Sequence, residues 1–286
     1  MAHCIVDEAE AILDIEYAVL DKGFVRLVDY MGGDERVVQS ARVSYGEGTK
    51  SYREDAALID YLLRNGHTSP FEQVVLTFHV KLPIFVARQW IRHRTARLNE
   101  VSGRYSVLKD DFYLPAPGDL AGQGVDNKQG RSDVILDPEA AGTIRNNFET
   151  AQKKAYMEYA QLLEKGLARE LARINLPLSL YTEWYWQIDL HNLFHFLKLR
   201  LDPHAQKEIK LYAEILLDIT KKIAPRCCAS FDENILSAVR FSRSEFEELQ
   251  RRLQVNESGI MEGRDKALTG KALERFKEKI QTGRQK

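Results

Sequence analysis

The sequence predicts an α+β fold, in which a sheet is flanked by helices. Two stretches, 73–82 and 180–188, alternate hydrophobic side chains with others as half-buried strands do. Longer segments around them show the helical spacing of hydrophobic residues together with helix start and stop signals. A chain of 286 residues with 44% hydrophobic content can bury a substantial core, as one large domain or as one domain with appendages.

Composition narrows the class of protein. The net charge is −1, so any basic patch is local, and bulk attraction to nucleic acid or membrane is not supported. The three cysteines include the adjacent pair Cys227 and Cys228, which does not resemble a disulfide framework and favours a reducing compartment. No apolar run reaches the roughly 18 residues of a membrane span, and the acidic start does not resemble a signal peptide. The expected location is the cytoplasm.

The first elements are predicted from composition and stop signals. Residues 1–17 form an N-terminal extension in which we identify no chemistry. A strand rich in Val, Leu and Phe is predicted over 23–29. Helices are predicted over 35–43 and 54–64, and Gly66 is a good C-terminal stop for the second.

A capping box is predicted before the first clear strand. Ser69 stands at the cap, Pro70 at the first helical position and Glu72 three residues after the cap. The free N–H groups of such a helix start also bind anions, such as the pyrophosphate of a cofactor. In the strand 73–82 that follows, His79 falls on the polar face, so we expect it to be solvated rather than catalytic.

The second half alternates loops and helices. The loop 114–133 is rich in Pro, Gly, Asp and Asn, and is either disordered or a functional lid. A helix capped by Asp137 is predicted to reach residue 166, and a second one to end before Pro177. Asp189 is predicted to cap a helix after the strand 180–188, and Asp202 another that runs to residue 224.

Positive charge gathers between residues 88 and 106. A short helix with Pro83 at its first position is predicted to place Arg88 and Arg92 on one polar face. The cations that follow are Arg92, His93, Arg94, Arg97 and Arg104. Glu100 alone cannot balance them, which points to a phosphate ligand. Asn99, Glu100, Ser102 and Gly103 add the amide, carboxylate, hydroxyl and bare backbone that orient a polar heterocycle.

Other interpretations of these residues remain open. A phosphate-binding or nucleic-acid-binding module would use the arginines without redox chemistry, and a solvated basic face would bind nothing. A metalloenzyme would use His191, His195 and His204, but no HExxH motif or suitably spaced Cys pair accompanies them, so no metal site is predicted. Neither GxGxxG nor GxxxxGK[ST] occurs. No His is evidently paired with Ser102 to activate it, so we expect it to hydrogen-bond a substrate.

The cationic stretch resembles the signature of the flavin-dependent thymidylate synthases, Arg-His-Arg-x-x-Ser-x-Asn-Glu-x-Ser-x-Arg. It reads here as Arg92-His93-Arg94, Asn99-Glu100, Ser102 and Arg104, with Arg97 where the family usually has Ser. The segment 67–72 is similar to the family's His-x-Ser/Thr-Pro-x-Glu element. The resemblance covers 18–226 as one domain and leaves 227–286 outside it, as a charged helical appendage. It implies the thymidylate synthase-complementing fold, with a central, mainly antiparallel sheet.

The resemblance also implies an activity. The protein would convert dUMP to dTMP, with methylenetetrahydrofolate as one-carbon donor and NADPH-reduced FAD as hydride source. Arg200 would be catalytic, since a fixed guanidinium beside the uracil edge stabilises negative charge as N3 loses its proton. Its alternative role is that of a cation at a helix C-terminus. A homotetramer with shared active sites is implied.

The same resemblance assigns the binding residues. Those implied to hold dUMP are Gln89, Trp90, Ile91, Arg92, Glu100, Val101, Ser102, Gly103, Arg104, Arg173 and Arg200. Those implied to hold FAD are Ser69, Arg92, His93, Arg94, Glu100, Asp189, His191 and His195. Arg97 has no assigned role.

Overall fold

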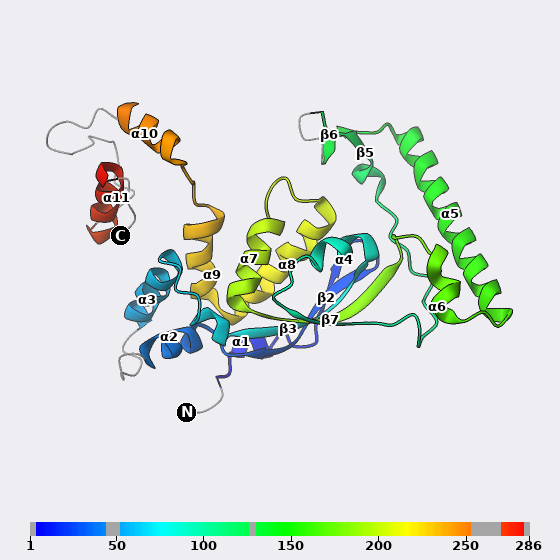
Figure 1. Ribbon diagram of the computed structural model, residues 1–286, viewed down its shortest axis with the longest axis horizontal. Helices are drawn as coiled ribbons and strands as arrows, with labels where there is room; N and C mark the ends of the chain where they lie inside the picture. Colours follow the sequence, from blue (N-terminus) through cyan, green and yellow to red (C-terminus); the bar gives the residue numbers. More distant parts are fainter. Residues whose placement is uncertain (1–3, 44–51, 126–129, 253–269, 283–286) are drawn as a thin grey trace. The chain divides into compact units, whose positions relative to one another are not determined.

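A computed structural model describes residues 4–43, 52–125, 130–252 and 270–282. The chain divides into two compact units, Met1–Leu236 and Ser237–Lys286. The larger unit contains a five-stranded sheet in the order β1-β2-β3-β7-β4, and all four strand pairs are antiparallel (Figure 1). Its strands are β1 (Glu16–Val19), β2 (Gly23–Met31), β3 (Val75–Pro83), β7 (Tyr181–Asp189) and β4 (Arg97–Glu100). The predicted α+β fold with a mainly antiparallel central sheet is confirmed.

Helices flank this sheet, and α7 and α8 cover one of its faces (Figure 1). The helices of the larger unit are α1 (Asp7–Glu10), α2 (Asp34–Arg42), α3 (Tyr52–Arg64), α4 (Ile84–Trp90), α5 (Pro138–Glu164), α6 (Arg169–Ala172), α7 (Leu190–Arg200), α8 (Lys207–Ile223) and α9 (Pro225–Phe231). The short turns are η2 (Phe71–Gln73), η3 (Pro117–Asp119), η4 (Arg173–Asn175) and η5 (Asp232–Leu236). The strands β5 (Ala121–Gln123) and β6 (Arg131–Ile135) form a separate hairpin.

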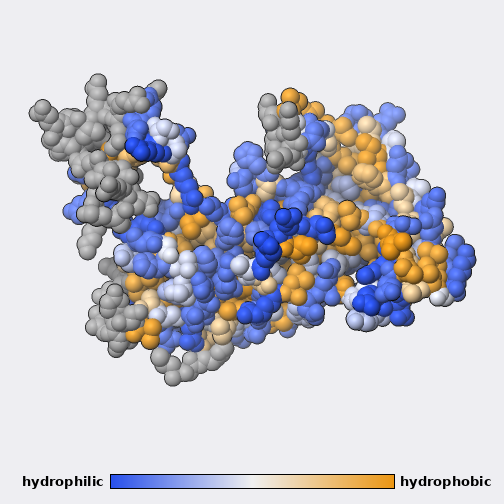
Figure 2. Space-filling view, viewed as in Figure 1, coloured by the Kyte–Doolittle hydropathy of each residue, from blue (hydrophilic) through white to orange (hydrophobic). Residues whose placement is uncertain are grey.

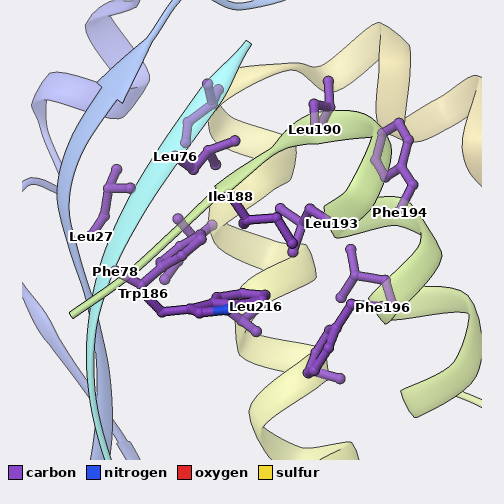
Figure 3. Close-up of a cluster of buried hydrophobic side chains, with 14 of the residues drawn as sticks. Leu27, Leu76, Phe78, Trp186, Ile188, Leu190, Leu193, Phe194, Phe196 and Leu216 are labelled. Atoms are coloured by element: carbon purple, nitrogen blue, oxygen red, sulfur yellow. The ribbon is translucent and has the colours of Figure 1, made fainter. Parts of the chain in front are cut away.

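The core lies between the central sheet and these two helices. Phe78 of β3 stands opposite Trp186 of β7, and Leu76 stands opposite Ile188. All four are at most 1% exposed, which confirms the alternation predicted in both strands. Each such burial stabilises the fold by about 1.5–3 kcal/mol. Their helical partners in the core include Leu190, Leu193, Phe196 and Leu216 (Figure 3).

Several predicted helix ends are confirmed. Asp137 caps α5 by accepting from the backbone N–H groups of Glu139 and Ala140. Asp189 caps α7 by accepting from the N–H of Asn192. Gly66 follows α3 with φ +71°, a left-handed conformation that glycine adopts without strain.

Other predicted starts are wrong. The Ser69 capping box does not form, because Pro70 takes the cap position of the single turn η2, and it is the hydroxyl of Thr68 that reaches Glu72, at 2.9 Å. Pro83 caps α4 rather than occupying its first helical position. The helix predicted from Asp202 begins only at Lys207, since Asp202 closes a local turn by accepting from the backbone of His204.

The segment before Pro177 is also less helical than predicted. Only α6 and the turn η4 form there. Leu176 is extended, with ψ 132°, as expected for a residue that precedes proline.

The loop 114–133 is ordered over its described residues. It contains η3, β5 and the start of β6, with Asp119 paired to Lys207 and Arg131 paired to Glu208. Disorder is therefore wrong for these residues, while residues 126–129 lie outside the described part. A lid function stays a prediction.

In the smaller unit, the described residues form two helices. They are α10 (Arg243–Arg252) and α11 (Gly270–Thr282). Before α10, Ser242 and Glu245 form a reciprocal capping box, with bonds of 3.3 and 2.7 Å. Across the described residues of the whole chain, no helix is long and apolar enough to cross a membrane.

Candidate functional site

The cationic stretch begins where α4 ends. Trp90 is the last residue of that helix, and its side chain is fully buried against Trp184, Trp186 and Phe196, at ring distances of 4.8–5.7 Å. Any contact from Trp90 to a ligand is thus left to its backbone. Arg92 follows the helix and does not share its polar face with Arg88, because α4 stops before it.

Arg200, the last residue of α7, is held against the end of α4. Its Nε donates to Nε2 of His93 at 3.1 Å, and its Nη2 donates to the backbone oxygen of Gln89 at 3.3 Å. The ring of His93 also lies 5.9 Å from that of His195. We call Gln89, His93, His195 and Arg200 the Arg200 cluster. The structure thus brings together four predicted site residues, from α4, from the turn that follows it and from α7.

His93 is kept neutral in this cluster. Burial, then the charge of Arg200 and then His195, lower the pKa of His93 from 6.5 to about 4. At pH 7 the ring therefore has one nitrogen that accepts a hydrogen bond, and Nε2 is the one facing the Arg200 donor. Burial also lowers the pKa of Arg200. An arginine nevertheless keeps its charge, so the cluster presents one fixed cation.

Further cations lie next to this cluster. Arg92 and Arg94 are exposed and, among the described residues, neither pairs with a carboxylate. Both are therefore available to an external anion. Ile91, beside them, is 40% exposed.

The remaining predicted cofactor residues lie near the start of α7. The carboxylate of Asp189 is hydrogen-bonded to Asn192: it accepts from the backbone N–H at 2.9 Å and from Nδ2 at 2.7 Å. His191 is half-buried one turn before His195. Ser69 is exposed just before η2, which packs against α7, and the N–H of Leu190 bonds the oxygen of Val74 at 2.8 Å. The cofactor role of these residues stays a prediction.

The residues predicted to hold the nucleotide form a second group at the end of β4. Glu100 accepts from the hydroxyl of Thr182 at 2.6 Å. Gly103 is buried against Arg173, where a Cβ would come within 3.1 Å of the guanidinium. A side chain at this position would require Arg173 and Leu108 to shift by a few tenths of an ångström. We call Glu100, Ser102, Gly103, Arg104 and Arg173 the Arg173 cluster.

Two further contacts complete the Arg173 cluster. Nε of Arg104 pairs with Glu170 at 3.1 Å, and the backbone N–H of Arg104 donates to Oγ of Ser102 at 3.3 Å. Val101, beside them, is 44% exposed. No hydrogen bond or ion pair of the described residues joins this cluster to the Arg200 cluster.

Arg97, which the sequence left without a role, belongs to the sheet edge. It stands opposite Gln187 in the β4–β7 pair and donates to the Gln187 side chain at 3.3 Å. Gln187 in turn donates to the hydroxyl of Thr77 at 3.2 Å. Arg97 therefore anchors the strand that carries the signature.

His79 is not solvated as predicted. Its side chain is 14% exposed, stacks on Tyr185 with ring centroids 4.9 Å apart, and lies 2.7 Å from the Arg26 guanidinium. Burial, followed by the charge of Arg26, lowers the pKa of His79. The prediction failed because side chains of the neighbouring strands cover the polar face of β3.

Sequence reasoning missed the residues behind the site. Gln206 accepts from the Gln89 side chain, and Glu208 supports Gln206. Thr182 is the one polar residue in the inward-facing row of the strand 180–188, and its hydroxyl was the signal for a polar partner, which is Glu100. Among the described residues no group of three or more His, Cys, Asp or Glu side chains is placed to bind a metal ion.

Two family models match the chain. The family model of the thymidylate synthase complementing protein matches residues 26–226. The model of the thymidylate synthase ThyX C-terminal domain matches 239–286, so the tail, expected outside the resemblance, has a family match of its own.

Individual relatives point to the same family as the two family models. A flavin-dependent thymidylate synthase of Treponema denticola is 62% identical over 273 residues, covering 96% of this chain and 100% of the relative. One from Treponema pallidum is 57% identical and covers 100% of this chain and 91% of the relative. A UMP/dUMP methylase PolB from Streptomyces cacaoi, bound with 5-Br dUMP, is 33% identical with a TM-score of 0.70 over 77% of this chain and 99% of that one. This chain belongs to the flavin-dependent thymidylate synthase family.

Proposed function

We propose that this protein is a flavin-dependent thymidylate synthase that methylates dUMP to dTMP, with FAD as its flavin, NADPH as reductant and methylenetetrahydrofolate as one-carbon donor. The observation that carries the proposal is the Arg200 guanidinium, fixed by the neutral ring of His93 and by the backbone of Gln89. A phosphate-binding module has no need of a half-buried, oriented cation set apart from its exposed arginines. Membership of the family supports the same reaction.

The donor set fits a flavin dinucleotide. Arg92 and Arg94 are exposed cations without carboxylate partners among the described residues, which suits the pyrophosphate of FAD. His93, Glu100, Asp189, His191, His195 and Ser69 complete the proposed cofactor set. When bound, the flavin supplies the hydride. The chain's own contribution is position and electric field.

The nucleotide is proposed to lie against both clusters. Arg104 and Arg173 bind its phosphate, and Ser102 and Gly103 hold it through a hydroxyl and a bare backbone. Gln89, with the backbone of Trp90 and Ile91, meets the base. Arg200 stabilises the negative charge that develops on the uracil edge during the reaction, and its own charge persists because arginine does not deprotonate. Arg92, Glu100 and Val101 complete the substrate set.

A homotetramer with sites shared between subunits is part of the proposal. Membership of the family supports this assembly. Hydrophobic residues also gather over α5 and α6 (Figure 2). The exposed ones are Phe148, Met157, Leu171, Ile174 and Leu178. Phe148 also lines a cavity of about 420 Å³, together with Phe85 and Tyr113. Such an exposed apolar surface is expected where another subunit covers it.

The cytoplasm is the proposed location. Cys4, Cys227 and Cys228 are all free thiols. Free cysteines are typical of a reducing compartment.

The colour of the purified protein tests the cofactor. A yellow protein with flavin absorbance at about 450 nm supports the proposal that this is an FAD-dependent enzyme. A colourless protein that cannot be reconstituted with FAD contradicts the proposal. Stoichiometric zinc or iron would instead favour the metalloenzyme that uses His191, His195 and His204.

Replacement of Arg200 tests the mechanism. Arg200→Ala is expected to keep FAD binding but to lose about 10²-fold or more in dTMP formation, because a preorganised charge is removed from the transition state. Lys222→Ala is the matched control: it removes an exposed cation from the last turn of another helix, α8, outside both clusters. A helix-dipole role would predict similar small effects for both variants. Unchanged turnover in Arg200→Ala would contradict the proposed mechanism.

A further inference from the structure

A buried carboxylate lies behind the Arg200 cluster. Glu208, in the first turn of α8, has a side chain that is only 4% exposed. One of its oxygens, Oε1, accepts from Arg131 of the β5–β6 hairpin at 2.5 Å and from the hydroxyl of Tyr113 at 3.3 Å. The other, Oε2, accepts from Nε2 of Gln206 at 2.8 Å. Both oxygens thus have partners, as the burial of a charge requires.

The contact to Gln206 extends to the site. The side-chain oxygen of Gln206 accepts from Nε2 of Gln89. The backbone oxygen of Gln89 in turn accepts from Arg200. A chain of hydrogen bonds therefore runs from Glu208 through two amides to the residue that contacts the catalytic guanidinium.

The direction of this chain is set at its buried end. A carboxylate paired with a guanidinium only accepts hydrogen bonds, whereas a Gln amide has one donating end and one accepting end. Gln206 must turn its NH₂ toward Glu208, because its oxygen there would face another acceptor. The side-chain oxygen of Gln206 then faces Gln89, so Gln89 must donate to it with its own NH₂ group. The amide oxygen of Gln89 is the end left for a ligand.

We propose that Glu208 is a positioning residue which, through Gln206, fixes the Gln89 amide with its oxygen toward the substrate, and so selects uracil over cytosine. The inference rests on the proposed role of Gln89 in dUMP binding. In dUMP the sugar occupies N1, so N3–H is the one ring N–H that can donate to Gln89 before the reaction begins. Cytosine has a lone pair at N3, which would face the Gln89 oxygen and repel it. A site built to pair a donor discriminates strongly against a ligand that lacks it.

The test measures dissociation constants of dUMP and dCMP by calorimetry on the full-length, FAD-loaded enzyme. Glu208→Gln gives Gln206 a partner that can donate as well as accept. The side-chain amides of Gln206 and Gln89 can then rotate, so that the oxygen and the NH₂ group of each exchange places. We expect the preference for dUMP over dCMP to fall about tenfold or more, partly through tighter dCMP binding. If Glu208 only supports the fold, its replacement would weaken the binding of dUMP and dCMP equally, and the ratio of their dissociation constants would not change.

A second variant covers the case in which Glu208→Gln fails to fold. Gln206→Met breaks the chain but leaves Glu208 with Arg131 and Tyr113, and it is expected to lose the same preference. The double variant should lose no more than either single one, because both act through Gln89. Tyr113→Phe is the matched control, since it removes one neutral donor from Glu208 without changing how Gln206 must point.

The outcomes separate the two proposals. If Gln89→Ala weakens dUMP binding while folded Glu208→Gln and Gln206→Met keep the wild-type preference, the positioning role is overturned and the proposed function stands. If Gln89→Ala binds dUMP as the wild type does, the assignment of Gln89 itself fails. A loss of preference in both variants, with Tyr113→Phe unchanged, supports the inference.

Discussion

Arg200 and His93 form a pair in which each partner fixes the other. The guanidinium donates to Nε2 of His93, and its charge helps to keep that ring neutral and able to accept. A protonated His93 could not accept from Arg200 and would repel it. The cation of the site thus depends on the protonation state of its neighbour.

Replacement of Arg200 by a neutral residue should be visible in the titration of His93. Its pKa, about 4 in the native protein, is expected to rise in Arg200→Met because a repelling charge is removed. It should stay below 6.5, since burial is the larger cause and persists. NMR titration of the ring protons checks this, with Lys222→Met as control. An unchanged pKa would show that Arg200 does not influence the ring.

At the residue scale, the sequence predicted the residues proposed to contact ligands but not the residues that position them. The spacing of Arg92, Glu100 and Ser102 is visible in the sequence and is enough to indicate the family. The roles of Gln206 and Glu208 could not be predicted, because Gln206 contacts Gln89 from more than 100 positions away in the chain and Glu208 contacts Gln206. Such contacts exist only after the strands and helices have packed.

The helix α9 begins with a cap supplied from the other end of the sequence. Asp34, 8% exposed at the start of α2, accepts from the N–H groups of Arg226 and Cys227 at 2.9 and 3.0 Å. These are orphan donors of the first helical turn. One carboxylate thus ties the two helices together.

Loss of this cap should cost stability rather than activity. Asp34→Ala is expected to lower the free energy of unfolding by about 2 kcal/mol, because it leaves buried N–H groups unpaired. Urea unfolding followed by circular dichroism measures the change. Asp218→Ala, which removes an exposed carboxylate paired with Lys221, should cost under about 1 kcal/mol. Equal losses in the two variants would argue against the capping role.

At the element scale the predictions succeeded where burial imposes a period. β3 and β7 are central strands with alternating buried residues, and both were predicted to within a residue or two at their ends. β4 was missed because all four of its residues are exposed, so no alternation marks it. β1, of four residues, is too short to show a pattern.

For the whole molecule, the shared-site proposal predicts complementation between two inactive variants. Arg200→Ala keeps an intact Arg173 cluster, and Arg173→Ala keeps an intact Arg200 cluster. If each site combines one cluster from each of two subunits, random mixing restores about a quarter of the sites. dTMP formation after dissociation and reassociation of the mixture measures this, with each variant treated alone as control. A mixture as inactive as its parents would contradict shared sites.

The position of β4 at the sheet edge has a consequence for local stability. The strand that carries Glu100 pairs with β7 on one side only, whereas β3 is paired on both sides. Edge amides open more readily than central ones, so β4 should exchange hydrogen for deuterium much faster than β3. dUMP that bridges Glu100 and Ser102 would then slow exchange mainly in residues 97–104, and mass spectrometry of the corresponding peptides would detect it. Substrate binding would then stabilise a strand that the sheet itself supports on one side only.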